Sequence, residues 1–202
     1  QQSARAIASY QDELDIDHTH RDSLEALERL YLAREDWKEV LRLYERMLEV
    51  ILEGDAQVVL YGKMATLLET QFQDQDGAID AYIQSLAVQP DYEPAITSLE
   101  RLYYEMERWV DLVEMVDTHL QIAQERMTRV SLFNESGRVY RDKIQDLHSA
   151  IEAFVRSLQE ESQQPDILRE LGLLYEDNGD WELAVQSYQQ LAQTQSDPQE
   201  RM

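Results

Sequence analysis

Leu27-Glu28-Arg29-Leu30-Tyr31, followed by Trp37, is the stretch that decides the fold, because it returns twice. It comes back as Leu99-Glu100-Arg101-Leu102-Tyr103 with Trp109, and again as Leu171-Gly172-Leu173-Leu174-Tyr175 with Trp181. The protein's three tryptophans are therefore evenly spaced, 72 residues apart. Similarity at a fixed period predicts a repeat array, in which each unit buries its apolar face against its neighbours.

The composition favours helices over strands. Leu, Glu, Gln, Ala and Arg are abundant, and these residues lose little conformational freedom in a helix. The 202 residues include six glycines and four prolines, which are few turn signals for a protein built from strands. The prolines fall at junctions between the predicted helix pairs, where a missing amide hydrogen costs least: Pro90, Pro94, Pro165 and Pro198.

We expect residues 1–202 to form a single array of paired helices. The predicted units cover residues 21–53, 55–90, 93–124, 126–160 and 164–195, and residues 1–16 supply the second helix of a partial unit. Asp36 is the expected N-cap of the second helix in the first full unit. The last four residues, 199–202, repeat residues 124–127, so we interpret the chain as a fragment of a longer array.

The last unit resembles the tetratricopeptide repeat. Its spacing of Leu168, Leu171, Gly172, Tyr175, Ala184 and Tyr188 is that of the family. A small residue in the first helix, Gly172, faces a small residue in the second, Ala184, so the two helix axes can approach. The pair recurs as Ala65 with Ala78 and as Gly137 with Ala150, and we expect the recurring Tyr and Trp side chains to pack in the core or between helices.

Two units depart from this pattern. Glu28 faces Val40 in the first full unit, and Glu100 faces Leu112 in the third. Because these side chains are larger than glycine or alanine, we expect both helix pairs to be more open.

The resemblance implies an all-α fold, an α-solenoid of antiparallel helix pairs wound into a right-handed superhelix. In this family the first helices of the pairs line a concave surface that binds peptides. Aligned on the last unit, that surface would carry eight candidate partner-binding residues: Arg29, Arg101, Tyr104, Asn134, Arg138, Arg141, Arg169 and Leu173. Arginine can hold a carboxylate through two parallel hydrogen bonds. Alternatively, these arginines pair with acidic residues on adjacent helices and hold the array together.

The strongly negative net charge of the chain indicates which kinds of partner are unfavourable. Forty-one acidic and eighteen basic side chains give a net charge of −23, which disfavours nucleic acid and anionic membrane surfaces as partners. No apolar run reaches the ~18 to 20 residues of a membrane span, so we expect no membrane insertion. The absence of cysteine fits a reducing compartment, and a cytoplasmic location is the default expectation.

No group of residues predicts catalysis, and we expect no metal and no cofactor. His18-Thr19-His20 offers imidazoles that suit zinc or nickel, but a junction loop favours simple polar surface. Asp74–Gly77 and Asp177–Asp180 resemble the start of calcium loops without the ~12-residue frame that a glutamate closes. Asp, Asn and Gly are also the residues that turns require.

The leading hypothesis is therefore a non-catalytic scaffold that binds a protein or peptide partner on its concave face. One alternative is a self-assembling structural protein, a filament or coat, because terminal repeats without polar caps leave apolar helix faces for self-association. The other is a regulatory arm of a larger enzyme whose catalytic domain lies outside these residues.

Overall fold

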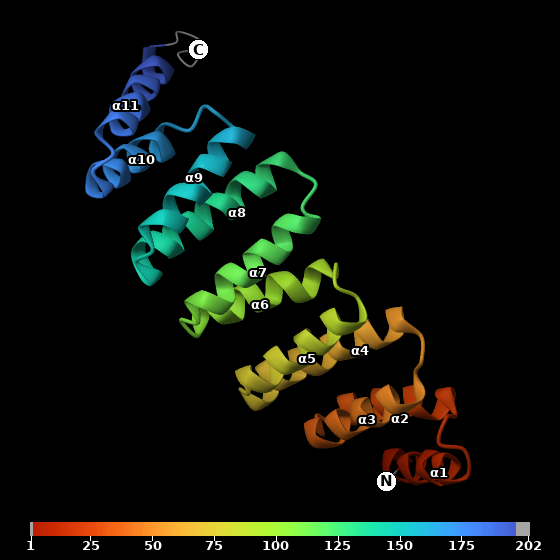
Figure 1. Ribbon diagram of the computed structural model, residues 1–202. Helices are drawn as coiled ribbons and strands as arrows, with labels where there is room; N and C mark the ends of the chain where they lie inside the picture. The colour runs from red at the N-terminus through yellow and green to blue at the C-terminus, as the bar shows by residue number, and fades with distance from the viewer. Residues whose placement is uncertain (1, 197–202) are drawn as a thin grey trace. The chain divides into compact units, whose positions relative to one another are not determined.

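The protein is helical throughout its described part. The computed structural model describes residues 2–196, which form eleven α-helices, two π-helical turns and no strand (Figure 1). The α-helices are α1 (Gln2–Ile16), α2 (Arg21–Ala33), α3 (Trp37–Val50), α4 (Gly54–Leu67), α5 (Gln75–Val88), α6 (Glu93–Glu105), α7 (Trp109–Ile122), α8 (Arg126–Val139), α9 (Leu147–Glu160), α10 (Pro165–Asn178) and α11 (Trp181–Ser196). The π-helical turns are η1 (Leu68–Phe72) and η2 (Tyr140–Ile144). The predicted all-α fold of repeated helix pairs is confirmed.

The described residues fall into two compact units, one up to Leu102 and one from Tyr103 onward, so the division lies within α6. Most helices that follow one another in sequence within a unit pack side by side, as α8 and α9 do. The division of the chain into individual repeats and the right-handed superhelix stay predictions.

The core of the first unit lies between helices α1 to α4. Its buried side chains come from all four of these helices: Ile7, Leu14, Leu24, Leu27, Tyr31, Val40, Leu43, Tyr44, Met47, Leu60 and Leu67. Arg46 of α3 donates a hydrogen bond of 2.8 Å to the backbone carbonyl of Leu14, which links α3 to α1. In the second unit a cluster of Ala150, Phe154, Ile167, Leu171 and Leu174 joins α9 to α10.

The backbone repeats the 72-residue period of the sequence. Glu35, Glu107 and Gly179 follow α2, α6 and α10, and all three have positive φ angles, of 55°, 56° and 82°. Gln73 and Gln145, which follow η1 and η2, have φ angles of 55° and 62°. The five residues are thus two recurring kinds of turn, each set 72 residues apart, and each turn reverses the chain between two paired helices.

The small residues set how closely the helices approach. Ala65, Ala78 and Ala150 are completely buried. A Cβ atom built on Gly137 would lie 2.6 Å from the ring of Phe154, and one built on Gly172 would lie 2.5 Å from the ring of Tyr188. The glycines therefore make room for an aromatic ring on the second helix, which the pairing of small residues alone does not predict.

The prediction of a more open first pair is also confirmed. The backbones of α2 and α3 approach closely over a shorter length than those of α4 and α5. Glu28 lies between α2 and α3, where its carboxylate accepts a 3.0 Å hydrogen bond from the hydroxyl of Tyr44.

The expectation that the recurring tyrosines and tryptophans are packed is wrong for Trp181. Trp181 is 64% exposed, whereas Trp37 and Trp109 are half-buried. All three tryptophans occupy the same backbone position, because α3, α7 and α11 each begin at one. No described helix follows α11 to cover Trp181, so the shared position does not give it a shared environment.

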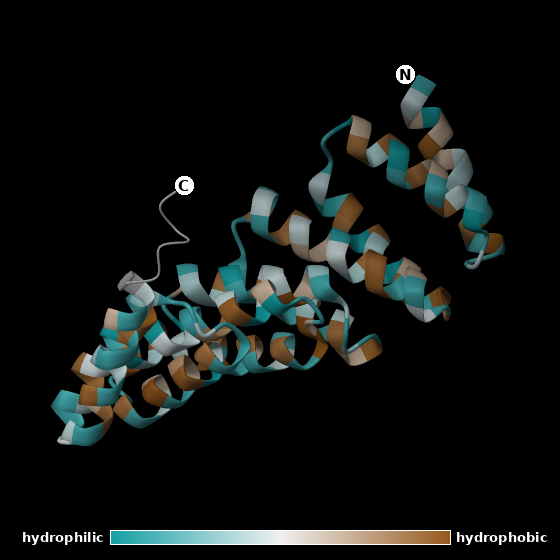
Figure 2. Ribbon diagram, turned by 90° about the horizontal axis from the view of Figure 1, so that it is seen from above, coloured by the Kyte–Doolittle hydropathy of each residue, from teal (hydrophilic) through white to brown (hydrophobic). Residues whose placement is uncertain are grey.

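Each described helix mixes apolar and polar residues along its length, as the hydropathy colours show (Figure 2). None of them combines the length and the apolar character that crossing a membrane requires. Asp36 is the N-cap of α3 as predicted, but its side chain makes no capping hydrogen bond.

Candidate functional site

A groove of about 680 Å³ lies within the first unit, and we call it the first-helix groove because α2 and α4, the first members of their pairs, form much of it. Its lining comes from five helices and the turns that join them: Glu28, Leu32, Trp37, Tyr44, Val59, Gly62, Lys63, Thr66, Leu67, Thr70, Gln71, Tyr82, Tyr92, Pro94 and Ser98. Trp37 and Tyr44 of α3 and Tyr82 of α5 show that the second helices also contribute to its lining.

The lining of this groove is mainly aromatic and aliphatic. Trp37, Tyr44, Tyr82 and Tyr92 contribute four aromatic rings, each of which offers a large apolar contact area with a polar tip. Leu32 is 38% exposed and Val59 is 52% exposed, so both present apolar surface to solvent. A Cβ atom at Gly62 would meet nothing within 4 Å, which leaves the wall of the groove open at that point.

The only charged side chains among the described lining residues form a pair. Lys63 Nζ lies 2.7 Å from Glu28 Oε1, and it stands over the ring of Tyr44 at 5.9 Å from the ring centre. Burial and the neighbouring carboxylate of Glu28 raise the pKa of Tyr44. The protonated hydroxyl of Tyr44 donates a 3.0 Å hydrogen bond to Glu28. Because the charges of Lys63 and Glu28 cancel, the lining of the groove has no net charge inside a strongly acidic chain.

The predicted partner-binding residues of the first unit lie outside this groove. Arg29 is exposed, and its Nε donates to the carbonyl oxygen of Glu25 in its own helix at 3.3 Å. Arg101 pairs with Glu69 of η1 at 2.7 Å.

In the second unit, the structure brings two of the predicted arginines to one carboxylate. Arg138 and Arg141 of adjacent turns lie 3.6 Å and 2.6 Å from the two oxygens of Glu170 on α10. Arg141 also holds Asp142 through two hydrogen bonds, of 2.6 Å and 2.8 Å. These contacts raise the pKa of Arg141 and lower the pKa of Asp142. The alternative interpretation, in which the arginines pair with acidic residues on adjacent helices, predicts ion pairs of this kind.

The other predicted residues of the second unit have contacts that do not involve Glu170. Arg169 pairs with Asp166 at 3.1 Å on the surface of α10, and the ring of Tyr104 meets that of Trp109 edge to face at 5.4 Å. Asn134 donates a 2.8 Å hydrogen bond to Gln164, while its buried oxygen Oδ1 has no partner among the described residues. Leu173 is 53% exposed.

Sequence reasoning missed the residues of the first-helix groove because their types are those of a core. Trp37, Tyr44 and Tyr82 follow the helical apolar pattern, which predicts burial and gives no sign that these side chains also line a groove. Two signals could have found it: Val59 is an apolar residue outside the buried face of α4, and Gly62 is a glycine in the middle of a helix.

The described residues contain no group of three or more His, Cys, Asp or Glu side chains that could hold a metal ion. Turn chemistry explains both calcium-like stretches, as predicted. Asp74 caps α5 by accepting a 3.0 Å hydrogen bond from the amide of Gly77, and Gly179 ends α10 with its positive φ angle.

Comparisons with known proteins agree with the helical repeat. The family model for the tetratricopeptide repeat matches residues 23–56 and 167–202. One similar solved structure, that of Naa15/Naa10 bound to HypK-THB, is 17% identical with a TM-score of 0.65, over 93% of this chain and 28% of that one. A crystal structure of MamA is 16% identical with a TM-score of 0.50, over 82% of this chain and 92% of that one. No curated protein matches the sequence significantly.

Proposed function

Because the chain carries tetratricopeptide repeats, we propose that it is a non-catalytic scaffold that binds a peptide or protein partner in the first-helix groove. The observation that supports this function is the groove itself. It is preformed and aromatic, and its two charged side chains already neutralise each other. Ligand-binding pockets share this combination of apolar walls and few, well-placed polar groups.

The groove favours a partner with apolar anchors. Exposed Leu32 and Val59 lose water when an aliphatic or aromatic side chain covers them, and such buried anchors carry most of the binding energy in protein interfaces. The net charge of −23 favours basic residues beside those anchors, because it attracts them over a long range. We therefore expect a segment with large apolar side chains and basic flanks.

One pair of variants tests this function. Val59→Arg places a long charged side chain in the groove, and Val185→Arg makes the same change at a valine of equal exposure on α11, outside it. Partners are captured from the native source by the wild-type protein, and their dissociation constants are then measured for each variant. We expect Val59→Arg to weaken binding at least tenfold and Val185→Arg to leave it unchanged. If both variants bound the partner equally well, the first-helix groove would not be the binding site.

The eight residues predicted from the sequence are a separate part of the proposal. Reversing Arg101, Arg138 and Arg169 to glutamate should abolish partner capture and leave the helical content intact, as circular dichroism would report. If capture were undiminished, these arginines would not bind the partner and would only pair with neighbouring carboxylates.

Self-assembly is the second candidate function, and the apolar surface of α11 favours it. Trp181, Leu183 and Val185 are 64%, 41% and 54% exposed, which is unusual for large apolar side chains on one helix. Sedimentation over a range of protein concentrations separates the two functions. Growth without limit would indicate a filament or coat, and a species of fixed size would favour the scaffold.

A further inference from the structure

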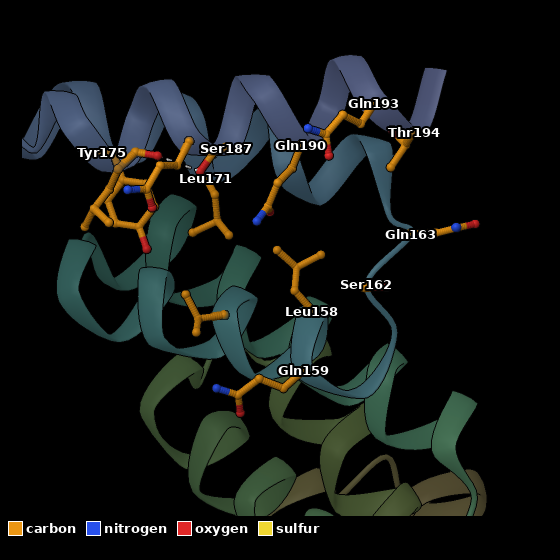
Figure 3. Close-up of a pocket in the computed structure, with 13 residues that line it drawn as sticks. Leu158, Gln159, Ser162, Gln163, Leu171, Tyr175, Ser187, Gln190, Gln193 and Thr194 are labelled. Carbon is orange, nitrogen blue, oxygen red and sulfur yellow. Dashed lines mark hydrogen bonds between the residues drawn. The ribbon is translucent and has the colours of Figure 1, made fainter. Parts of the chain in front are cut away.

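A second groove, of about 570 Å³, lies in the second unit between α9 and α11, both second members of their pairs (Figure 3). We call it the amide groove. Leu171 and Tyr175 of α10 form its floor, and Leu158 of α9 adds apolar surface. Gln190 extends from α11 toward Leu158 across the opening (Figure 3).

The amide groove contains no formal charge. None of its described lining residues is acidic or basic, although 29% of the chain is charged. Five glutamines line it instead: Gln159, Gln163, Gln186, Gln190 and Gln193. Their side-chain amides make no hydrogen bond to any described residue, while the hydroxyls of Ser187 and Thr194 donate to carbonyls of their own helix at 3.0 Å and 2.8 Å. The glutamine amides are therefore available to a ligand.

The equivalent place one helix pair earlier shows that the fold does not require this neutrality. A cavity of about 190 Å³ there is lined by α7, α8 and α9 and includes Asp117, Glu152 and Arg156. Matching Ala150 to Ala184 places Glu152 opposite Gln186 and Arg156 opposite Gln190 in the alignment. Glu152 and Arg156 form an ion pair of 2.5 Å, so two glutamines stand where the preceding pair carries a salt bridge.

The glutamines on α11 are spaced to suit an extended peptide. Residues four apart on a helix are about 6 Å apart along its axis, which is the distance from Gln186 to Gln190. An extended peptide turns the same side of its backbone outward about every 6.6 Å. Each glutamine amide carries both donors and an acceptor, so successive side chains can pair with the amide hydrogens and carbonyls of such a backbone.

We propose that the amide groove binds a short extended segment of another protein, about three to four residues long, whose side chains are uncharged. Small polar or aliphatic side chains of the segment would rest on Leu158, Leu171 and Tyr175. A charged side chain would lose its hydration in the groove without gaining an opposite charge, so the groove selects against acidic and basic segments. The glutamines of this surface that lie in helices are all on second helices, and no residue lines both grooves.

The test uses a displayed library of random decapeptides, selected on the 202-residue protein. Binding of each recovered peptide is then measured by fluorescence anisotropy on two double variants. Gln186→Glu with Gln190→Arg transfers the charges of the preceding helix pair into the groove. Gln84→Glu with Gln121→Arg makes the same changes at exposed glutamines that line neither groove.

We expect a class of recovered peptides with an uncharged core of three to four residues. These peptides should lose at least tenfold in affinity on the groove variant and none on the control variant or on Val59→Arg. The proposal is overturned if no recovered peptide depends on Gln186 and Gln190, or if those that do are charged. Concentration-dependent self-association that the groove variant abolishes would also overturn it, because the occupant would then be a second copy of the chain.

Discussion

Gly137 shows, at the scale of single residues, how tightly the helices of the second unit pack. A Cβ atom there would lie 2.6 Å from the ring of Phe154, which is fully buried, so the ring or the backbone would have to shift. We expect Gly137→Ala to lower the free energy of unfolding by about 1 to 3 kcal/mol, which is the usual cost of overfilling a packed core. Urea unfolding followed by circular dichroism measures the change.

Gly62→Ala is the matched control for that substitution. It is also a glycine within a helix, but a Cβ atom there meets nothing within 4 Å. Alanine should therefore raise the free energy of unfolding by up to about 1 kcal/mol through its better helix propensity. If both substitutions had the same effect, the close contact of Gly137 with Phe154 would be wrong.

The turn residues with positive φ angles allow a second prediction. Glu107 and Gly179 occupy equivalent turns, with φ angles of 56° and 82°, and a side chain in this left-handed region costs about 1 kcal/mol. Glu107→Gly should therefore stabilise the protein by up to about 1 kcal/mol, and Gly179→Glu should destabilise it by a similar amount. Midpoints of urea unfolding report both, and a stabilising Gly179→Glu would contradict the shared turn geometry.

The sequence pattern predicted how helices pack better than it predicted which side chains are exposed to solvent. The spacing of Ala65 with Ala78 and of Gly137 with Ala150 predicted close helix pairs, because a small residue permits close approach wherever it lies in a pair. The exposure of Trp181 could not be predicted, because it depends on whether another helix covers the start of α11. The repeat fixes where a residue lies in its helix, but the exposure of its side chain also depends on which other helices pack against it.

At the scale of elements, the start of α9 depends on one side chain. Asp146 accepts hydrogen bonds from the backbone amide of Ser149 at 3.1 Å and from its hydroxyl at 2.7 Å, and these bonds lower the pKa of Asp146 below its ordinary value of 3.8. A carboxyl whose pKa is lower in the folded state stabilises the protein above the ordinary pKa. That stabilisation is lost as the pH falls through the folded pKa.

We therefore expect Asp146→Ala to cost about 1 kcal/mol at pH 7, which is typical of a lost N-cap. The difference between wild type and variant should shrink as the pH falls below 3.8, and urea unfolding at several pH values measures it. Asp146→Asn serves as the control, because asparagine caps helices without a titrating group and should keep most of the stability. A difference that stays constant with pH would mean that the carboxylate form is not what caps α9.

The turns after α4 and α8 were the elements least accessible to prediction. The sequence indicates a turn near Asp74, but not that the chain first widens into the π-helical turns η1 and η2. The π-helical turns place extra residues before Gln73 and Gln145. These residues help to explain why the 72-residue period averages 36 residues per helix pair, which is longer than the 34 residues of the usual repeat. The length of the sequence period shows that the helix pairs have extra residues, but it does not show where in the backbone they lie.

At the scale of the whole molecule, the proposed function rests on surfaces that lie between helices. The repeat supplies paired helices, and the residues that differ between pairs decide what each groove offers. The first-helix groove offers aromatic rings and exposed Val59, whereas the amide groove offers glutamines where the preceding pair has a salt bridge. Sequence reasoning found the helix pairs. It predicted partner binding on arginines that the structure shows bonded to carboxylates or to backbone.

Photo-cross-linking from residue 62 determines whether the partner occupies the first-helix groove. A benzophenone amino acid in place of Gly62 would extend into the open part of the first-helix groove, and the same group in place of Val185 would lie on the exposed face of α11. The proposed function predicts that, on irradiation with the captured partner, a covalent adduct forms from position 62 and not from position 185. Adducts from position 185 alone, or equally from both positions, would contradict it.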